Sequence, residues 1–272
     1  MRSSEIRTPA GRIAVWDTQG DGPPVLLVHG NSACKEMFRG QFDGELADRF
    51  RLIAFDLPGH GGSDDAASPA DAYTIGGFAE TAGGLLTALG VRRAVVFGWS
   101  LGGHVALEMV ARNSQAVAGV MICGTPPVPS GPEGLAFGFA PSPLMALTGA
   151  AVWSDADAER FARVACGARF EPFMLEAARR ADGRARAAFF ADALAGNPAD
   201  ERWIVETSPT PLAIVNGAED PFLNHAYFDQ LRYANLWRGT AHRLEGLGHA
   251  PFWDDPPRFN ALLARFAGDA TQ

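Results

Sequence analysis

The stretch that decides the fold is Val95-Val96-Phe97-Gly98-Trp99-Ser100-Leu101-Gly102-Gly103-His104. It begins as an apolar run typical of a buried strand and continues from Leu101 as a helical pattern. A G-x-S-x-G pattern between a strand and a helix presents its serine on a tight, strained turn. Chance alone would give about 0.14 such patterns in a chain of this composition. The strand-to-helix setting therefore makes Ser100 the predicted nucleophile.

Apolar runs and helical patterns alternate on both sides of this turn. This alternation predicts right-handed βαβ units and an α/β fold with a mostly parallel central sheet flanked by helices. We predict strands at residues 13–16, 25–28, 52–55, 95–97, 117–122, 212–215 and 242–244, and helices at 74–89, 101–112 and 257–266.

The α/β rhythm is interrupted once, after a strand predicted to end near Cys123. A proline-rich stretch from Thr125 to Pro132 forbids regular structure, and Ala-, Arg- and Phe-rich helical sequence follows. We therefore predict one domain, with residues 1–124 and 207–272 as the core and residues 125–206 as an inserted helical cap.

Composition excludes several classes of protein. The 272 residues are 47% hydrophobic and 20% charged, which is ordinary for a globular protein, and the net charge of −8 argues against a nucleic-acid partner. No apolar window suits a membrane span or a secretory signal, so we expect a cytoplasmic protein without a membrane partner. Three cysteines without CxxC spacing indicate reduced thiols rather than a disulfide framework or a zinc site.

A second functional loop follows the strand at residues 25–28, which ends in His29-Gly30-Asn31. Enzymes with a G-x-S-x-G turn place a backbone N–H here, facing the carbonyl oxygen of the substrate. We assign the oxyanion hole to the N–H groups of Asn31 and Leu101, and we expect the Asn31 side chain to contact substrate. His29 precedes a glycine at a strand end, which favours a role in bracing the loop.

A serine hydroxyl needs a histidine to take its proton and a carboxylate to orient that histidine. In this fold the chain order is serine, acid, histidine. Asp220 follows a predicted strand with G-x-x-D spacing from Gly217, and Glu219 is the alternative acid. His249, in a glycine-rich loop after the last predicted strand, is the predicted base. Surface or packing roles are expected for His60, His104, His225 and His242.

The motifs resemble a known family. Asp56-Leu57-Pro58-Gly59-His60-Gly61-Gly62-Ser63, together with the His-Gly, G-x-S-x-G, G-x-x-D and terminal Gly-His segments, resembles the α/β-hydrolase superfamily along nearly the whole chain. A narrower resemblance is to the metal-independent N-acyl-homoserine lactonases of this fold. Residues 29–32, 96–104, 124–128, 182–186, 235–237 and 248–252 carry it. The sequence departs from that group at Asp220, where the group has a glutamate.

The narrower resemblance implies a hydrolase that opens the homoserine lactone ring and so silences a bacterial signal, with no metal or organic cofactor. The H-x-H-x-D-H cluster of metal-dependent lactonases is absent from the sequence. The partner would be a small acyl lactone or ester. The predicted triad equally suits a carboxylesterase or a C–C bond hydrolase, and a low-turnover ligand receptor on the same fold is a third alternative. The predicted substrate contacts, besides Asn31, are Trp99, Phe38, Phe137 and Phe161.

Overall fold

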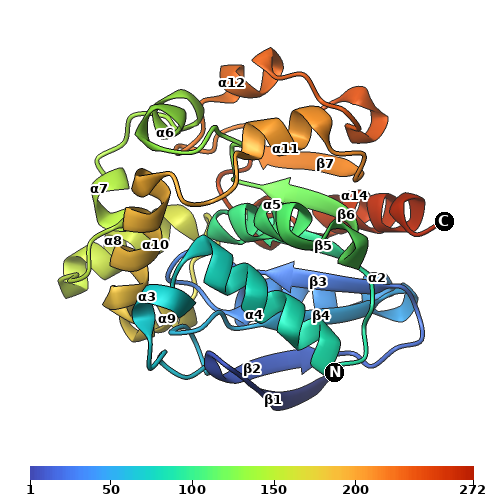
Figure 1. Ribbon diagram of the computed structural model, residues 1–272, viewed down its shortest axis with the longest axis horizontal. Coiled ribbons are helices and arrows are strands. Elements are labelled where there is room, and N and C mark those ends of the chain that lie inside the picture. Colours follow the sequence, from blue (N-terminus) through green and yellow to red (C-terminus); the bar gives the residue numbers. More distant parts are fainter.

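A computed structural model describes residues 1–272 and contains one eight-stranded sheet (Figure 1). The strand order is β1-β2-β4-β3-β5-β6-β7-β8. The two pairs β1–β2 and β2–β4 are antiparallel, and every other pair is parallel. The strands are β1 (Arg2–Thr8), β2 (Gly11–Asp17), β3 (Pro24–Val28), β4 (Arg51–Phe55), β5 (Ala94–Trp99), β6 (Val117–Cys123), β7 (Leu212–Gly217) and β8 (His242–Leu244).

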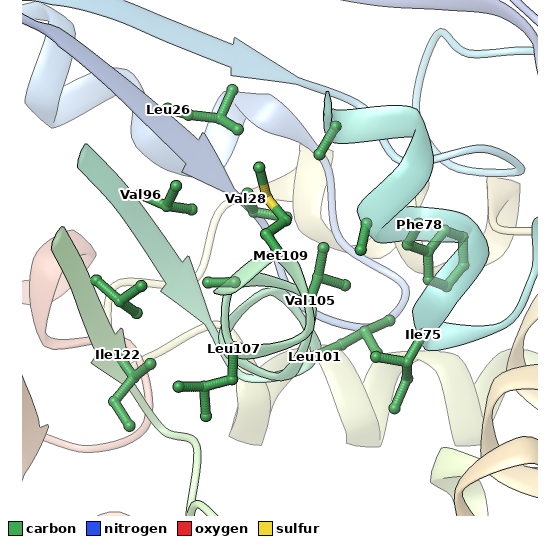
Figure 2. Packing of buried hydrophobic residues seen from close by; sticks show 14 of the residues in the cluster. Leu26, Val28, Ile75, Phe78, Val96, Leu101, Val105, Leu107, Met109 and Ile122 are labelled. Carbon is green, nitrogen blue, oxygen red and sulfur yellow. The ribbon is translucent and has the colours of Figure 1, made fainter. Parts of the chain in front are cut away.

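Helices cover both faces of the sheet, which explains why its central strands are continuously apolar. In β3 the side chains alternate between two cores: Leu26 and Val28 lie in one buried cluster, and Val25 and Leu27 lie in the other. The first cluster includes residues of α4 (Ile75–Ala88) and α5 (Leu101–Asn113), and the second includes residues of α14 (Pro256–Ala270). Figure 2 shows α5 end-on, with its apolar side chains between the strands and α4.

Six helices lie in the segment between β6 and β7. They are α6 (Pro132–Gly138), α7 (Met145–Thr148), α8 (Asp155–Ala165), α9 (Pro172–Arg180), α10 (Gly183–Ala195) and α11 (Glu201–Thr207). Ser154 caps α8 in a reciprocal hydrogen-bonded pair with Asp157, which fixes where that helix begins. Figure 1 shows α7, α8 and α10 beside the end of the sheet to which β3 and β6 point. The proposed division of the chain at residues 125 and 206 stays a prediction.

Short helices complete the chain. They are η1 (Lys35–Phe38), α1 (Arg39–Phe42), α2 (Glu45–Arg49), α3 (Pro69–Ala72), η2 (Ser114–Ala116), α12 (His225–Gln230), η3 (Trp237–Gly239) and α13 (Pro251–Asp254). None of the helices combines the length and the apolar character that crossing a membrane would need.

The predicted strands and long helices all occur in the structure with slightly different ends. Strand β1 was not predicted. It is an edge strand that pairs only with β2, and its residues are exposed or half-buried. Because neither face of β1 is fully buried, its sequence lacks a clear apolar alternation.

Candidate active site

Ser100 lies on a strained turn between β5 and α5. Its backbone has φ 54° and ψ −121°, a conformation that non-glycine residues rarely adopt. A Cβ atom at Gly98 would collide with the carbonyl of Gly102, and one at Gly102 would collide with the carbonyl of Val28. Both glycines are therefore required by close backbone approach. The Ser100 N–H donates to the Cys123 carbonyl at 2.8 Å, which ties the turn to the end of β6.

Two backbone N–H groups near Ser100 are available to a substrate oxygen. Leu101 begins α5, and the first N–H groups of a helix have no intrahelical acceptor. The N–H of Asn31, after the end of β3, donates no hydrogen bond within the protein. The loop of Asn31 approaches the serine closely, since a Cβ atom at Gly30 would lie 3.0 Å from Ser100 Cβ. The structure thus places both predicted oxyanion donors beside the predicted nucleophile.

His29 holds this loop in place. Its Nε2 accepts a hydrogen bond from the Leu57 N–H at 3.0 Å, so Nδ1 carries the ring proton and donates to the Gly30 carbonyl at 2.8 Å. Complete burial lowers the pKa of His29 to about 4. A neutral histidine with both nitrogens engaged fits the predicted bracing role.

His249 and Asp220 form a buried pair. His249 Nδ1 lies 2.6 Å from Asp220 Oδ2, and the two side chains are 4% and 0% exposed. The other carboxylate oxygen accepts from the Phe222 N–H at 2.9 Å, and the Phe222 ring packs edge-on against the imidazole. Trp99 Nε1 donates to the His249 carbonyl at 2.9 Å. The carboxylate accepts the Nδ1 proton, which leaves Nε2 with a free lone pair.

Glu219, the alternative acid, has a different place. It is exposed, and its carboxylate accepts a hydrogen bond from the Gly246 N–H at 3.1 Å. This contact ties the β7 loop to the loop that carries His249. Asp220, and not Glu219, is therefore the carboxylate that contacts the His249 ring.

Gly124, after β6, leaves space for His249, because a Cβ atom there would lie 2.6 Å from His249 Cε1.

One apolar cavity contains most of the predicted site residues. Ser100, Leu101, Asn31, His249 and Phe161 line it. Most of its other walls come from helices of the segment between β6 and β7 and from the loops that join them. Residues of these walls include Val128, Leu135, Phe139, Met145, Thr148, Phe189 and Phe190. An apolar wall around a serine and a histidine suits a substrate with an acyl chain.

The structure places three predicted substrate contacts outside this cavity. Phe38 is fully buried in the core, where it packs against Phe97 and Phe252. Trp99 is 1% exposed and supports the His249 loop. Phe137 is 56% exposed on α6. Phe38 and Trp99 thus make packing contacts, and substrate contacts by these three residues stay a prediction.

A buried arginine links the helical segment to the Asn31 loop. Arg186, on α10, is 4% exposed and donates to the carbonyls of Ala150, Ala151 and Ala181 and to Ser32 Oγ. Its guanidinium stacks on Trp153 at 3.9 Å, and burial lowers the pKa of Arg186 to about 10.

The chain of hydrogen bonds continues from Ser32 to Asn31, in the loop after β3, which we call the oxyanion loop. Ser32 Oγ donates to Asn31 Oδ1 at 3.0 Å, and Asn31 Nδ2 donates to the Thr148 carbonyl at 3.2 Å. The amide oxygen of Asn31 and one N–H of its NH₂ group are thus engaged by the protein. These bonds hold Asn31 in place, and a contact between its side chain and substrate stays a prediction.

One polar pair on the cavity wall was not predicted from the sequence. His104 and Glu201 both line the cavity, although we expected a surface or packing role for His104. Its position four residues after Ser100 on a helix was the available signal, because such residues share a face. Nothing in the sequence pointed to Glu201. No group of three or more histidine, cysteine, aspartate or glutamate side chains is arranged to hold a metal ion.

Residues 25–262 match the alpha/beta hydrolase family. The chain belongs to the alpha/beta hydrolase family. As in other alpha/beta sheets, the site of this hydrolase lies where parallel strands end at their carboxyl edge. The predicted fold is confirmed, with its mostly parallel sheet and flanking helices.

The chain is also similar to solved structures of one enzyme with a known substrate class. The structure of the N-acyl homoserine lactonase AidH complexed with N-butanoyl homoserine is 43% identical, with a TM-score of 0.97 over 100% of this chain and 98% of that chain. A serine-to-glycine variant of AidH, complexed with N-hexanoyl homoserine lactone, is 42% identical, with a TM-score of 0.96 over 100% and 99% of the two chains.

A curated relative is an esterase. The pimeloyl-[acyl-carrier protein] methyl ester esterase of Methylococcus capsulatus is 31% identical over 92% of this chain and 96% of its own. The resemblance to the family and to its N-acyl homoserine lactonases is confirmed as a similarity of the whole chain. Together these relatives support hydrolase activity.

Proposed function

We propose that the protein opens the lactone ring of N-acyl-homoserine lactones by serine catalysis. The observation that carries the proposal is the buried His249–Asp220 pair at 2.6 Å, in which His249 lines the same apolar cavity as a serine held at φ 54°. The choice of a lactone rests on the 43% identity and TM-score of 0.97 to AidH.

In the first half of the reaction Ser100 Oγ attacks the lactone carbonyl carbon while His249 Nε2 takes the hydroxyl proton. The N–H groups of Asn31 and Leu101 stabilise the oxyanion that forms, and losing one such donor typically costs about 2.7 to 4 kcal/mol of barrier. The tetrahedral intermediate collapses by breaking the bond to the ring oxygen. That oxygen takes the proton from His249 and becomes the homoserine hydroxyl.

In the second half a water molecule attacks the acyl-enzyme carbonyl and gives a proton to His249. The bond to Ser100 Oγ breaks, the serine regains its proton, and N-acyl-homoserine leaves. One water is consumed in total. Asp220 keeps His249 in the tautomer with Nδ1 protonated during both halves.

The apolar lining of the cavity also supports the proposed substrate. The cavity walls beside Ser100 are mostly apolar, and Phe161, Phe189 and Phe190 from the helical segment contribute to them. These walls would bury the acyl chain, while the strained serine and the two N–H groups face the lactone carbonyl. Ring opening would remove the lactone form of a bacterial signal.

An esterase acting on another acyl compound is the second candidate, and the methyl ester esterase of Methylococcus capsulatus favours it. The test compares kcat/KM for N-acyl-homoserine lactones of several chain lengths with p-nitrophenyl esters of the same acyl chains. The proposal predicts a higher kcat/KM on the lactones. Higher activity on the esters, with no ring-opened product from any lactone, would support the esterase instead.

A ligand receptor with little turnover is the third candidate. A fluorophosphonate probe reacts only with an activated serine, so it should label the wild type at Ser100. Failure of the probe to label Ser100 in folded protein would favour the receptor and contradict the proposed mechanism.

A further inference from the structure

A second histidine–carboxylate pair lies in the cavity, one helical turn from Ser100. His104 Nδ1, on α5, is 2.7 Å from Glu201 Oε1, at the start of α11. The two side chains are 14% and 7% exposed, and both residues line the cavity. The proposed mechanism leaves this pair without a role.

The contacts of Glu201 fix which nitrogen of His104 carries the proton. The second carboxylate oxygen of Glu201 accepts from the Val128 N–H at 3.3 Å, and the Glu201 N–H donates to the Val128 carbonyl at 3.2 Å. A carboxylate only accepts hydrogen bonds, so His104 Nδ1 must be the protonated nitrogen. In the neutral imidazole Nε2 is then an acceptor.

The acceptor nitrogen of His104, Nε2, has no hydrogen-bond partner within the protein. His104 Nε2 makes no hydrogen bond in the structure and is not among the buried polar atoms that lack one, so it remains accessible. The surrounding wall is apolar, with the Phe139 ring centroid 6.1 Å from that of His104 and Leu135 and Phe189 lining the same cavity. A lone acceptor on an apolar wall selects a substrate with a matching donor.

The position along α5 indicates which part of the substrate would meet it. Ser100 is the N-cap of α5 and His104 is the fourth residue of that helix, so at about 1.5 Å of rise per residue His104 lies about one turn from Ser100 and from the carbonyl that it would attack. That reach extends past the amide of an N-acyl-homoserine lactone to the first carbons of its acyl chain. We infer that His104 Nε2 accepts a hydrogen bond from a hydroxyl on the third carbon of the chain, so that the pair selects 3-hydroxyacyl lactones. This inference rests on the proposed function.

The variant Glu201→Gln should change His104 Nε2 from a hydrogen-bond acceptor into a donor. The Val128 N–H still requires an acceptor, so the glutamine oxygen faces Val128 and its NH₂ group faces His104 Nδ1. Nδ1 then becomes the acceptor, and the proton moves to Nε2. His104 Nε2 then donates a hydrogen bond, and the variant should prefer a substrate with the carbonyl of a 3-oxoacyl chain. A purely structural role for the pair would not exchange one preference for the other.

The experiment measures kcat/KM for three lactones of equal chain length, which are unsubstituted, 3-hydroxy and 3-oxo. The wild type should favour the 3-hydroxy compound. His104→Leu should lose about two- to tenfold on that compound, the usual value of one hydrogen bond, and change less on the unsubstituted one. Glu201→Gln, which keeps the side-chain size, should raise the ratio of 3-oxo to 3-hydroxy activity. Thermal unfolding checks that both variants fold.

The outcomes separate the two proposals. If the wild type opens none of the three lactones, the proposed function fails and the inference fails with it. If lactones are opened but His104→Leu lowers all three rates equally, or Glu201→Gln leaves the ratio unchanged, the inference alone is wrong. Because Glu201→Gln conserves size, the ratio can be measured even where the leucine variant does not fold.

Discussion

Replacing Arg186 by methionine should remove a hydrogen bond that holds the oxyanion loop in place, although Arg186 itself lies on another element. Arg186 lies on α10, in the segment between β6 and β7, and reaches Ser32 Oγ at 3.2 Å; Ser32 in turn donates to the side chain of Asn31. Methionine fills similar space but donates no hydrogen bond. The variant therefore removes the polar link from α10 to the loop that carries a proposed oxyanion donor.

The size of the effect follows from the lost contacts. The bonds from Arg186 to the Ala150 carbonyl at 2.9 Å and to Ser32 are well formed, and a hydrogen bond to a charged group contributes about 1.5 to 3 kcal/mol. The stacking on Trp153 adds about 1 kcal/mol, and relief from burying a charge offsets part of the sum. We expect the free energy of unfolding to fall by about 2 to 4 kcal/mol.

For a chain of this size, that change lowers Tm by roughly 5 to 15 °C. A displaced N–H group also weakens stabilisation of the transition state, so kcat should fall by up to about 10²-fold while KM changes little. Differential scanning calorimetry measures the first effect, and steady-state kinetics on N-hexanoyl homoserine lactone measures the second.

Arg184→Met is the matched control. Arg184 lies on the same helix, its side chain is 57% exposed, and it pairs with Asp182. Asp182 is 9% exposed, but in the variant it still accepts hydrogen bonds from the Tyr73 hydroxyl and the backbone N–H at position 184. The variant should therefore stay within about 1 kcal/mol of the wild type and keep its kcat. If Arg186→Met unfolds at the same temperature as Arg184→Met and retains full kcat, Arg186 does not support the oxyanion loop.

Three further predictions concern the base, its surroundings and the loop that carries Asn31. Asp220→Asn should lower kcat about 10⁴-fold without unfolding the protein, because the wrong tautomer of the base is favoured, whereas Glu219→Gln should stay close to wild type; the opposite order in steady-state kinetics would make Glu219 the acid. Gly124→Ala places a methyl group 2.6 Å from the imidazole of the base and should lower kcat far more than Gly239→Ala, which has the same positive φ, open space around it and a place outside the cavity; equal losses would show that backbone strain alone is responsible. His29 has a pKa of about 4 when folded and about 6.5 when unfolded, so the unfolded chain binds the proton first as the pH falls. Its share of stability is present above pH 6.5 and is lost towards pH 4, by up to about 1.4 kcal/mol per pH unit. Urea unfolding at pH 7 and pH 5 should show a smaller pH dependence in His29→Gln than in the wild type, and equal dependence would contradict the neutral bracing role.

The sequence predicted those elements best whose structure depends mainly on one kind of interaction. The buried strands β5 and β6 are continuously apolar because both faces are covered, and the Ser100 turn needs glycines at positions set by backbone contact. Strand β1 gave no such signal, since its pairing with β2 relies on backbone hydrogen bonds that almost any side chain allows.

Cavity contacts were harder to predict because they depend on how helices pack. Phe137 and Phe161 occur in similar Phe- and Ala-rich sequence, yet one is 56% exposed and the other lines the cavity. The direction of each aromatic ring follows from the placement of α6 and α8, which no local pattern encodes. Likewise His104 lies four residues after Ser100 and lines the same cavity, but its partner Glu201 comes from a helix far along the chain.

The most direct test of the central claim is mass-spectrometric detection of ring-opened product from N-hexanoyl homoserine lactone, with wild type and Ser100→Ala compared at equal concentration. Serine catalysis by Ser100 predicts N-hexanoyl homoserine from the wild type and a fall of about 10⁶-fold in kcat for the folded alanine variant. Ring opening by Ser100→Ala at a rate close to wild type, or no ring-opened product from the wild type, would contradict it.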